Sequence, residues 1–264
     1  MTGDRCPRWA PPLLAVQFLT RVPVPWLDRL SGEQVATGLV RAVGWFPLVG
    51  ALVGAVTAAA ALAAGTLWPA QVAVLLALAV EARLTGAFHE DAVADFCDAF
   101  GGGHSADDVR RIMKDSRIGS YGAVGLILAL GLRAALLVAV IGRFGALDAA
   151  IVIIASAAFG RLLAAVLMAV VPPATAGTGL TKDIASGVGP GVLALALATA
   201  MPGMLPFAHV APLAAMASIA AGLGFIVWFR ALLIRRIGGS TGDCLGFGVY
   251  VGQLLVLLAA MAAP

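Results

Sequence analysis

Long apolar stretches, each long enough to cross a membrane, divide this chain of 264 residues. A transmembrane helix needs about 20 mostly apolar residues. Windows of that kind lie at 43–64, 70–88, 121–141, 146–171, 190–207, 211–229 and 246–263. The short link between the fifth and sixth windows, Pro206–Pro212, predicts a helical hairpin. The pattern therefore predicts an all-α fold, a polytopic integral membrane helix bundle with about seven transmembrane helices.

The polar stretches between the windows are short. Residues 9–30 are apolar but contain Arg21 and several prolines, so we expect a short interfacial helix there rather than a span. The two polar stretches, 89–120 and 230–245, are too short to form a second folded unit. We therefore expect residues 1–264 to form a single membrane-embedded domain.

The composition is that of a bilayer protein. Hydrophobic residues make up 61% of the chain and charged residues 12%, whereas a soluble domain carries about 25% charged residues. The mean hydropathy is +0.99. These values exclude an ordinary soluble core, a disordered chain and a coiled coil. Cys6, Cys97 and Cys244 are odd in number and far apart, so no disulfide framework is expected.

The basic residues orient the predicted spans. With the N-terminus in the cytoplasm, 13 of the 17 Lys and Arg residues fall in cytoplasmic segments, and only Arg143 falls outside. Cytoplasmic loops carry such an excess. We therefore expect a multi-pass protein of the plasma (inner) membrane, surrounded by lipid, with 89–120 and 230–245 in the cytoplasm. The net charge is only +3 and the basic residues are spread thinly, which argues against a nucleic-acid partner.

Acidic residues are concentrated in one part of the chain, because eight of the 14 lie between Glu81 and Asp115. Asp91, Asp95 and Asp98 are spaced i, i+4 and i+7, which places them on one face of a helix. Three neighbouring carboxylates repel one another unless a cation lies among them. Ligands that are all oxygen suit Mg²⁺ or Mn²⁺ rather than zinc. The alternative is a solvated acidic face on a cytoplasmic helix.

His89 precedes this acidic row. It lies beside Glu90, but the HExxH pattern of metalloproteases is absent because position 93 is Val. A lone histidine of this kind is most often a hydrogen-bonding bystander. The other reading is a proton carrier in catalysis.

A basic stretch follows the acidic one. Ser105 followed by Asp108 predicts a capping box that starts a new helix. Lys114 and Arg117, next to Asp115 and Ser116, are candidates for binding phosphate or substrate. Arg110 and Arg111 share that reading, but their charge has a second explanation in the orientation of the spans.

Two further polar features stand nearer the C-terminus or inside the spans. The loop GGSTGDCLG, residues 238–246, offers Thr241 and Asp243 as substrate contacts, but it lacks the lysine of a nucleotide-binding P-loop. Arg133 and Arg161 lie within predicted spans, where an ionisable residue is a functional candidate by default. A structural partner, Glu81 or Asp148, is the alternative explanation.

The chain resembles the cobalamin synthases, the adenosylcobinamide-GDP ribazoletransferases, over nearly its whole length. The motifs that carry the resemblance are FLTRVPVP at 18–25, FPLVGALVG at 46–54, LTGAFHEDAVADFCDAF at 84–100, IMKDSRIGSYG at 112–122 and GGSTGDCLG at 238–246. The acidic motif followed by DSRIG is highly specific. The resemblance implies a membrane enzyme that uses Mg²⁺ and joins adenosylcobinamide-GDP to α-ribazole, or to its 5′-phosphate, with release of GMP.

Within that reaction the resemblance implies a role for each candidate. The metal ligands and catalytic carboxylates are Asp91, Asp95 and Asp98, with His89 as a further catalytic candidate. The phosphate-binding candidates are Lys114, Arg117 and Arg161, and the substrate-binding candidates are Asp115, Ser116, Thr241 and Asp243. One or two metal ions fit three carboxylates, and the sequence leaves a homo-oligomer open.

The chain departs from the family pattern in two places. Ala92 and Ala99 stand where the acidic motif usually has glycine, and alanine favours a helix there. Tyr250 and Gln253 stand where relatives carry carboxylates in the last span, which puts a carboxylate role for that span in doubt.

Two other functions compete with the ribazoletransferase. A CDP-alcohol phosphotransferase also places aspartates at the cytoplasmic face of a helix bundle, but its motif needs a DGxxAR start that this chain lacks. A divalent cation transporter would be expected to place its ionisable groups near the middle of the bilayer. The acidic row instead follows the second window.

Overall fold

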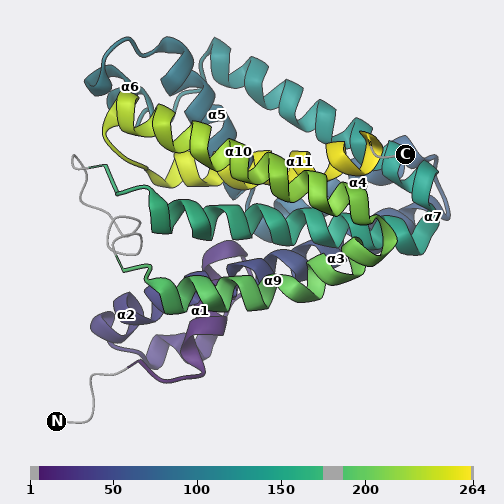
Figure 1. Ribbon diagram of the computed structural model, residues 1–264, viewed down its shortest axis with the longest axis horizontal. Coiled ribbons are helices and arrows are strands. Elements are labelled where there is room, and N and C mark those ends of the chain that lie inside the picture. Colours follow the sequence, from purple (N-terminus) through teal and green to yellow (C-terminus); the bar gives the residue numbers. More distant parts are fainter. Residues whose placement is uncertain (1–5, 175–186, 263–264) are drawn as a thin grey trace.

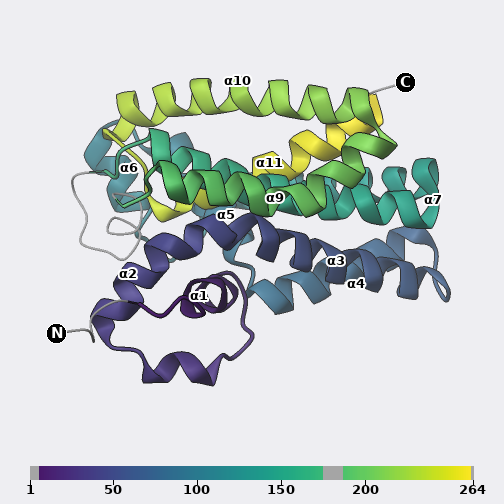
Figure 2. The same ribbon diagram turned by 60° about the horizontal axis from the view of Figure 1, so that its bottom comes forward.

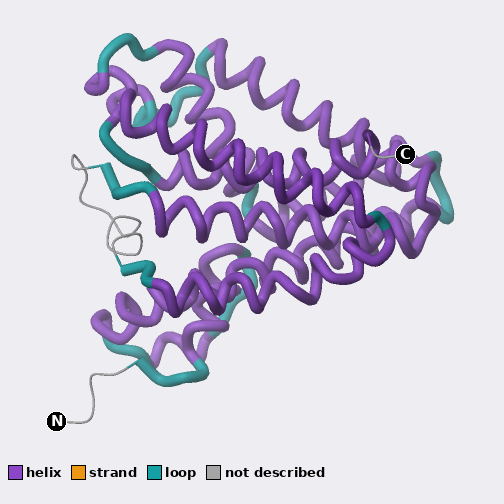
Figure 3. Tube along the Cα trace, in the orientation of Figure 1, coloured by secondary structure: helices purple, strands orange, loops and turns teal. Residues whose placement is uncertain are grey.

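The computed structural model describes residues 6–174 and 187–262. In these residues the chain is a bundle of helices, with the long helices running along the longest axis of the molecule (Figure 1). Most of the loops lie toward the two ends of the bundle (Figure 3). The α-helices are α1 (Ala10–Leu19), α2 (Gly32–Ala42), α3 (Phe46–Gly65), α4 (Ala70–Thr85), α5 (Phe88–Gly102), α6 (Ala106–Ile112), α7 (Ser120–Val170), α9 (Pro190–Val210), α10 (Pro212–Ile237) and α11 (Gly242–Ala262), and two short 3₁₀ turns cover Pro25–Arg29 and Val43–Trp45.

The structure confirms a helical polytopic membrane protein. In the described residues, five helices are long and apolar enough to cross a membrane, and α4 and α5 together make a sixth if the pair is one bent span. Six of the seven apolar windows fall mainly on α3, on one of the two halves of α7, or on α9, α10 or α11, and the window 70–88 covers α4 and the break that follows it. The number of crossings and their orientation stay a prediction.

Helix α7 doubles back on itself. Gly145 has φ 73° and ψ −177°, a conformation that interrupts the helix and is open to glycine. Before α7, Met113 contacts Thr241. After α7, the Pro172 carbonyl accepts a hydrogen bond from the Ser240 amide at 2.8 Å. Both ends of α7 therefore lie at the same end of the bundle, so that this one element accounts for the windows 121–141 and 146–171 (Figure 1).

The second window is broken rather than straight. Gly86 and Ala87 both have left-handed backbone angles, with φ of 74° and 56°, and α4 and α5 meet there at 90°. The predicted window 70–88 therefore ends as a helix at Thr85, because the left-handed pair cannot continue it. The acidic row begins just beyond this break, on α5.

The N-terminal segment lies beside the bundle. Helix α1 has ten residues, about 15 Å at the helical rise, so it is too short to cross a bilayer. Figure 2 views α1 nearly end-on while the long helices run across the page, so α1 crosses their direction. The Arg21 amide donates to the Leu84 carbonyl at 2.7 Å, which ties the end of α1 to the break between α4 and α5.

Small residues let the central helices approach closely, as expected for helices packing in lipid. A β-carbon added at Gly54 of α3 would meet the Ala157 β-carbon and the Ile154 α-carbon of α7 at 2.9 Å. A β-carbon at Gly252 of α11 would meet the Gly160 α-carbon at 2.8 Å. Helix α7 is thus held between α3 and α11, and the second half of α7 forms the centre of the bundle.

Candidate active site

The predicted acidic row forms one face of α5. Asp91 is exposed, and Asp95 and Asp98 are partly buried. Asp243, in the first turn of α11, lies close enough to interact electrostatically with Asp91 and Asp95. The structure therefore brings together two motifs that are more than 140 residues apart in the chain, and it adds Asp243 to the three aspartates of α5.

Asp98 also has a structural task. Its two carboxylate oxygens accept hydrogen bonds from the amides of Gly119 at 2.6 Å and Gly122 at 2.8 Å. These amides belong to the first turn of α7, where backbone donors lack partners within the helix. Asp98 thus supplies from α5 the cap that α7 lacks in its own sequence.

Asp91 and Asp95 differ from Asp98 in this respect. Neither makes a side-chain hydrogen bond within the described part of the chain, which leaves their oxygens open to a ligand. Across residues 6–174 and 187–262, no three His, Cys, Asp or Glu side chains are grouped closely enough to hold a metal ion by themselves. Mg²⁺ is usually bound by one or two carboxylates together with waters and substrate phosphates. The open carboxylates of Asp91 and Asp95 fit that mode of binding.

The basic stretch folds as predicted at its start. Ser105 and Asp108 form the predicted capping box of α6, with Ser105 Oγ accepting from the Asp108 amide at 3.1 Å. Arg110 pairs with Asp107 at 2.6 Å and donates to the Ile237 carbonyl. These contacts give Arg110 a place in the packing of α6 against the end of α10.

Arg117 is exposed and held by its neighbour Asp115. Its Nε donates to Asp115 Oδ1 at 3.0 Å, and its Nη2 to Asp115 Oδ2 at 2.7 Å. The Arg117 guanidinium lowers the pKa of Asp115 to about 2, so the pair is fully ionised at neutral pH. Lys114 and Ser116, on either side of Asp115, are exposed.

Thr241 joins the glycine-rich loop to the basic stretch. Its Oγ1 donates to Met113 Sδ at 2.9 Å and accepts from the Cys244 amide at 3.3 Å. The Thr241 side chain therefore caps the start of α11 and holds that start beside the segment that precedes α7. This contact places Asp243 at the same end of the bundle as Lys114 and Arg117.

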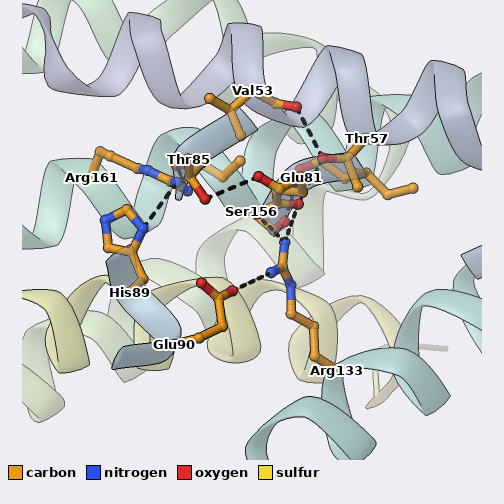
Figure 4. Close-up of polar contacts among 11 residues, drawn as sticks. Val53, Thr57, Glu81, Thr85, His89, Glu90, Arg133, Ser156 and Arg161 are labelled. Carbon is orange, nitrogen blue, oxygen red and sulfur yellow. Dashed lines mark hydrogen bonds and ion pairs between the residues drawn. The ribbon is translucent and has the colours of Figure 1, made fainter. Parts of the chain in front are cut away.

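A second polar cluster lies buried between the helices (Figure 4). Arg133 Nη2 is 2.8 and 2.7 Å from the two carboxylate oxygens of Glu81, and Thr57 donates to Glu81 at 2.6 Å. Arg133 also lies 3.7 Å from Glu90 and 5.6 Å from the centre of the Tyr250 ring. The sequence analysis named Glu81 and Asp148 as possible partners, and the structure pairs Arg133 with Glu81.

This buried cluster connects five helices. The sequence analysis predicted only part of it, the pairing of a buried arginine with Glu81. Glu81 precedes the break between α4 and α5, and Glu90 follows it, so Arg133 of α7 contacts both sides of the break. Tyr250 of the last helix packs against Arg133 rather than joining the acidic face. The cluster fixes the position from which α5 presents its aspartates.

Arg161 lies apart from the other phosphate-binding candidates. It is buried, with 1% of its surface exposed, whereas Lys114 and Arg117 are exposed in the segment before α7. Its Nη2 lies 3.5 Å from Nδ1 of His89, which is also buried (Figure 4). His89 therefore points into the bundle and not along the acidic face.

The chain is similar to proteins of one family over nearly its whole length. The family model described as Cobalamin-5-phosphate synthase matches residues 11–261. Proteins named adenosylcobinamide-GDP ribazoletransferase from Ralstonia nicotianae and Leptothrix cholodnii are 39% and 37% identical to it. The two alignments each cover 94% of this chain, and they cover 93% and 94% of the respective relatives. The protein of that name from Vibrio cholerae is 38% identical over 95% of this chain and 92% of its own length. No solved structure matches. The chain therefore belongs to the cobalamin-5-phosphate synthase family.

Proposed function

We propose that this protein is a ribazoletransferase of cobalamin synthesis. It joins adenosylcobinamide-GDP to α-ribazole, or to α-ribazole 5′-phosphate, and releases GMP in the last step of nucleotide-loop assembly. The observation that carries this proposal is the end-to-end match to relatives that bear this name, in a chain whose acidic face is assembled from two distant motifs. In the proposed orientation, the acidic face lies on the cytoplasmic side of the plasma membrane.

The acidic face is the proposed site of Mg²⁺. Asp91 and Asp95 would hold the ion through their open oxygens, with Asp98 and Asp243 beside them. When bound, Mg²⁺ supplies positive charge that neutralises the pyrophosphate of adenosylcobinamide-GDP. Without a cation, the four neighbouring carboxylates would repel that anionic substrate.

The bond changes define what the protein residues have to do. A ribose hydroxyl oxygen of α-ribazole forms a bond to the phosphorus attached to cobinamide. The bond from that phosphorus to the oxygen bridging it to GMP breaks, and GMP leaves with the bonding electrons. The hydroxyl proton passes to one aspartate of the face, because His89 points into the bundle and away from it. In phosphoryl transfer of this kind, positioning and charge neutralisation provide most of the rate enhancement.

The remaining candidates bind and orient the substrates. Lys114 and Arg117 are the proposed ligands of phosphate oxygens at the exposed end of the site, and Asp115 holds the Arg117 guanidinium in one plane. Arg161 is the proposed phosphate ligand inside the bundle. Ser116, Thr241 and Asp243 are the proposed contacts to the substrates beside the acidic face.

The proposal is tested with purified protein in liposomes. Incubation with adenosylcobinamide-GDP, α-ribazole and Mg²⁺ is expected to yield a cobalamin and GMP in equal amounts, and chelation of Mg²⁺ is expected to stop both. Asp95→Asn is the matched inactive variant, because it removes one charge of the face without a change of shape. Passage of Mg²⁺ through the liposomes with no release of GMP would replace the proposal by a cation transporter.

A further inference from the structure

The N-terminal motif FLTRVPVP, residues 18–25, places one arginine at the break between α4 and α5. The Arg21 amide donates to the Leu84 carbonyl at 2.7 Å, which fixes the backbone beside the break. The Arg21 side chain lies against Gly86. A β-carbon added at Gly86 would meet Arg21 Nε, and it would lie 3.1 Å from Arg21 Cζ and Nη2. The absence of a side chain at position 86 therefore makes room for the guanidinium.

The same stretch of chain lies beside the acidic face. Phe18, three residues before Arg21, meets the edge of Phe88 with ring centres 5.8 Å apart. Phe88 precedes Asp91 by three residues and Asp95 by seven on α5, which places these three side chains on one face of the helix. Together with the contact at the break, this pairing of rings places Arg21 at the N-terminal end of the acidic face.

The Arg21 guanidinium is available to a ligand. It is exposed, and it makes no hydrogen bond or ion pair with any of residues 6–174 and 187–262. Arg117 differs in this respect, because Asp115 holds its guanidinium with two hydrogen bonds. A planar guanidinium can bind a phosphate group through two of its N–H groups at once. Beside a site for phosphate esters, the open guanidinium of Arg21 is suited to that task.

The acidic face thus has a cation at each end. The Gly119 amide donates to Asp98 at 2.6 Å, so the segment that contains Arg117 meets the C-terminal end of the face. Phe88 and Asp98 are ten residues apart on α5, about 15 Å at the helical rise. The two phosphates of one pyrophosphate are much closer together than that. The cations at the two ends therefore serve different phosphate-bearing groups, and both groups adjoin the same face.

We propose that Arg21 binds the 5′-phosphate of α-ribazole 5′-phosphate. This inference rests on the proposed function and on the assignment of Arg117 to adenosylcobinamide-GDP. With its phosphate on Arg21, the ribazole has its ribose over Asp91 and Asp95, next to the pyrophosphate whose phosphorus the ribose hydroxyl attacks. The arginine makes the enzyme prefer the phosphorylated form of the ribazole. It also gives the motif FLTRVPVP a role in substrate binding.

The test compares the two forms of the ribazole in variants of the full-length protein. Arg21→Gln is expected to raise the KM for α-ribazole 5′-phosphate at least about tenfold, because a charge-assisted contact is lost. The KM for unphosphorylated α-ribazole and for adenosylcobinamide-GDP should stay within about twofold of the wild-type values. Titration calorimetry with α-ribazole 5′-phosphate alone should show the same loss of affinity. Arg29→Gln is the matched control, because Arg29 is exposed in the same N-terminal segment, and it should change none of these values.

Arg21→Gln keeps the backbone hydrogen bond to Leu84, so its melting temperature should equal that of the wild type. If the variant is nevertheless not recovered, Arg21→Lys decides. It keeps the charge and loses the two-pronged contact, so a smaller rise in KM is expected for the phosphorylated ribazole only.

Several outcomes would overturn the inference. Unchanged KM values in Arg21→Gln, or in Arg21→Lys if that variant decides, would leave Arg21 a charge that orients the N-terminal segment. Equal losses for both forms of the ribazole, or a rise in the KM for adenosylcobinamide-GDP alone, would show that Arg21 does not recognise the 5′-phosphate. An effect present in vesicles of anionic phospholipid and absent in neutral detergent would assign Arg21 to a lipid headgroup. Failure of the wild type to release GMP would instead reject the proposed function.

Discussion

The same substitution at two aspartates of one helical face is expected to have different effects on stability. Asp98 accepts hydrogen bonds from the amides of Gly119 and Gly122, whereas Asp95 makes no side-chain hydrogen bond within the described residues. An asparagine at position 98 keeps one carbonyl oxygen and turns an amide group toward the second backbone donor. Asp98→Asn therefore loses one charge-assisted hydrogen bond, and Asp95→Asn loses only a like-charge repulsion with its neighbours.

The magnitude follows from the contacts. A hydrogen bond to a charged group contributes about 1.5–3 kcal/mol, and for a chain of this length 1 kcal/mol lowers the melting temperature by about 2–4 °C. Asp98→Asn is thus expected to lower the melting temperature by roughly 3–12 °C. Asp95→Asn should melt at the wild-type temperature or slightly above it. Both variants should lose GMP release, since Asp95 is a proposed ligand of Mg²⁺ and Asp98 lies beside it and holds the start of α7.

The assay is a thermal scan of tryptophan fluorescence in detergent, run beside the GMP-release assay. Asp28→Asn is the matched control, because Asp28 is exposed in the turn Pro25–Arg29 and lies outside the acidic face. A loss of thermal stability in Asp95→Asn equal to that of Asp98→Asn would refute the division of roles between capping and an open ligand. Wild-type turnover of Asp95→Asn at saturating Mg²⁺ would refute its place in the metal site.

Three more predictions concern the buried ion pair, the exposed arginines and the orientation. Glu81→Gln leaves the Arg133 guanidinium buried with a weaker partner, so it should be destabilised by about 3–5 kcal/mol and recovered in lower amount, as measured by fluorescence-detected gel filtration. Arg117→Lys keeps the positive charge but loses the two-pronged geometry of the guanidinium, so the variant should insert normally and lose about tenfold or more in kcat/KM for adenosylcobinamide-GDP. Arg110→Lys should leave kcat/KM nearly unchanged. Equal, small losses in both variants would show that Arg117 serves only to orient the spans. A reporter enzyme fused after Pro264 should be active outside the cytoplasm, and cytoplasmic activity would show an error of one span.

Local features of the chain could be predicted from the sequence, because neighbouring residues determine them. The capping box of Ser105 and Asp108 and the single acidic face of α5 depend on spacings of a few residues, and the structure confirms them. The apolar windows predict helices for the same reason, except that the second window contains the break at Gly86 and Ala87. Gly50 and Gly54 are four residues apart, a spacing that places both on one helix face, and both lie against α7.

The features that depend on tertiary packing could not be predicted from the sequence. Asp98 accepts hydrogen bonds from Gly119 and Gly122, which are 21 and 24 positions away in the chain. The sequence around Gly119 gives no sign that a carboxylate from another helix caps the start of α7. The sequence analysis assigned Arg161 to the phosphate-binding candidates together with Lys114 and Arg117, because all three residues are basic. Its burial beside His89 follows only from how α5 rotates against α7.

The most direct test of the metal site is the binding of Mn²⁺ measured by electron paramagnetic resonance in the presence of adenosylcobinamide-GDP. The acidic face of α5 is expected to bind Mn²⁺ in the wild type and in Asp28→Asn with the same affinity. Asp95→Asn should bind it at least about tenfold more weakly, since one carboxylate ligand charge is removed. Equal affinity in the wild type and in Asp95→Asn would contradict the assignment of the metal to this face.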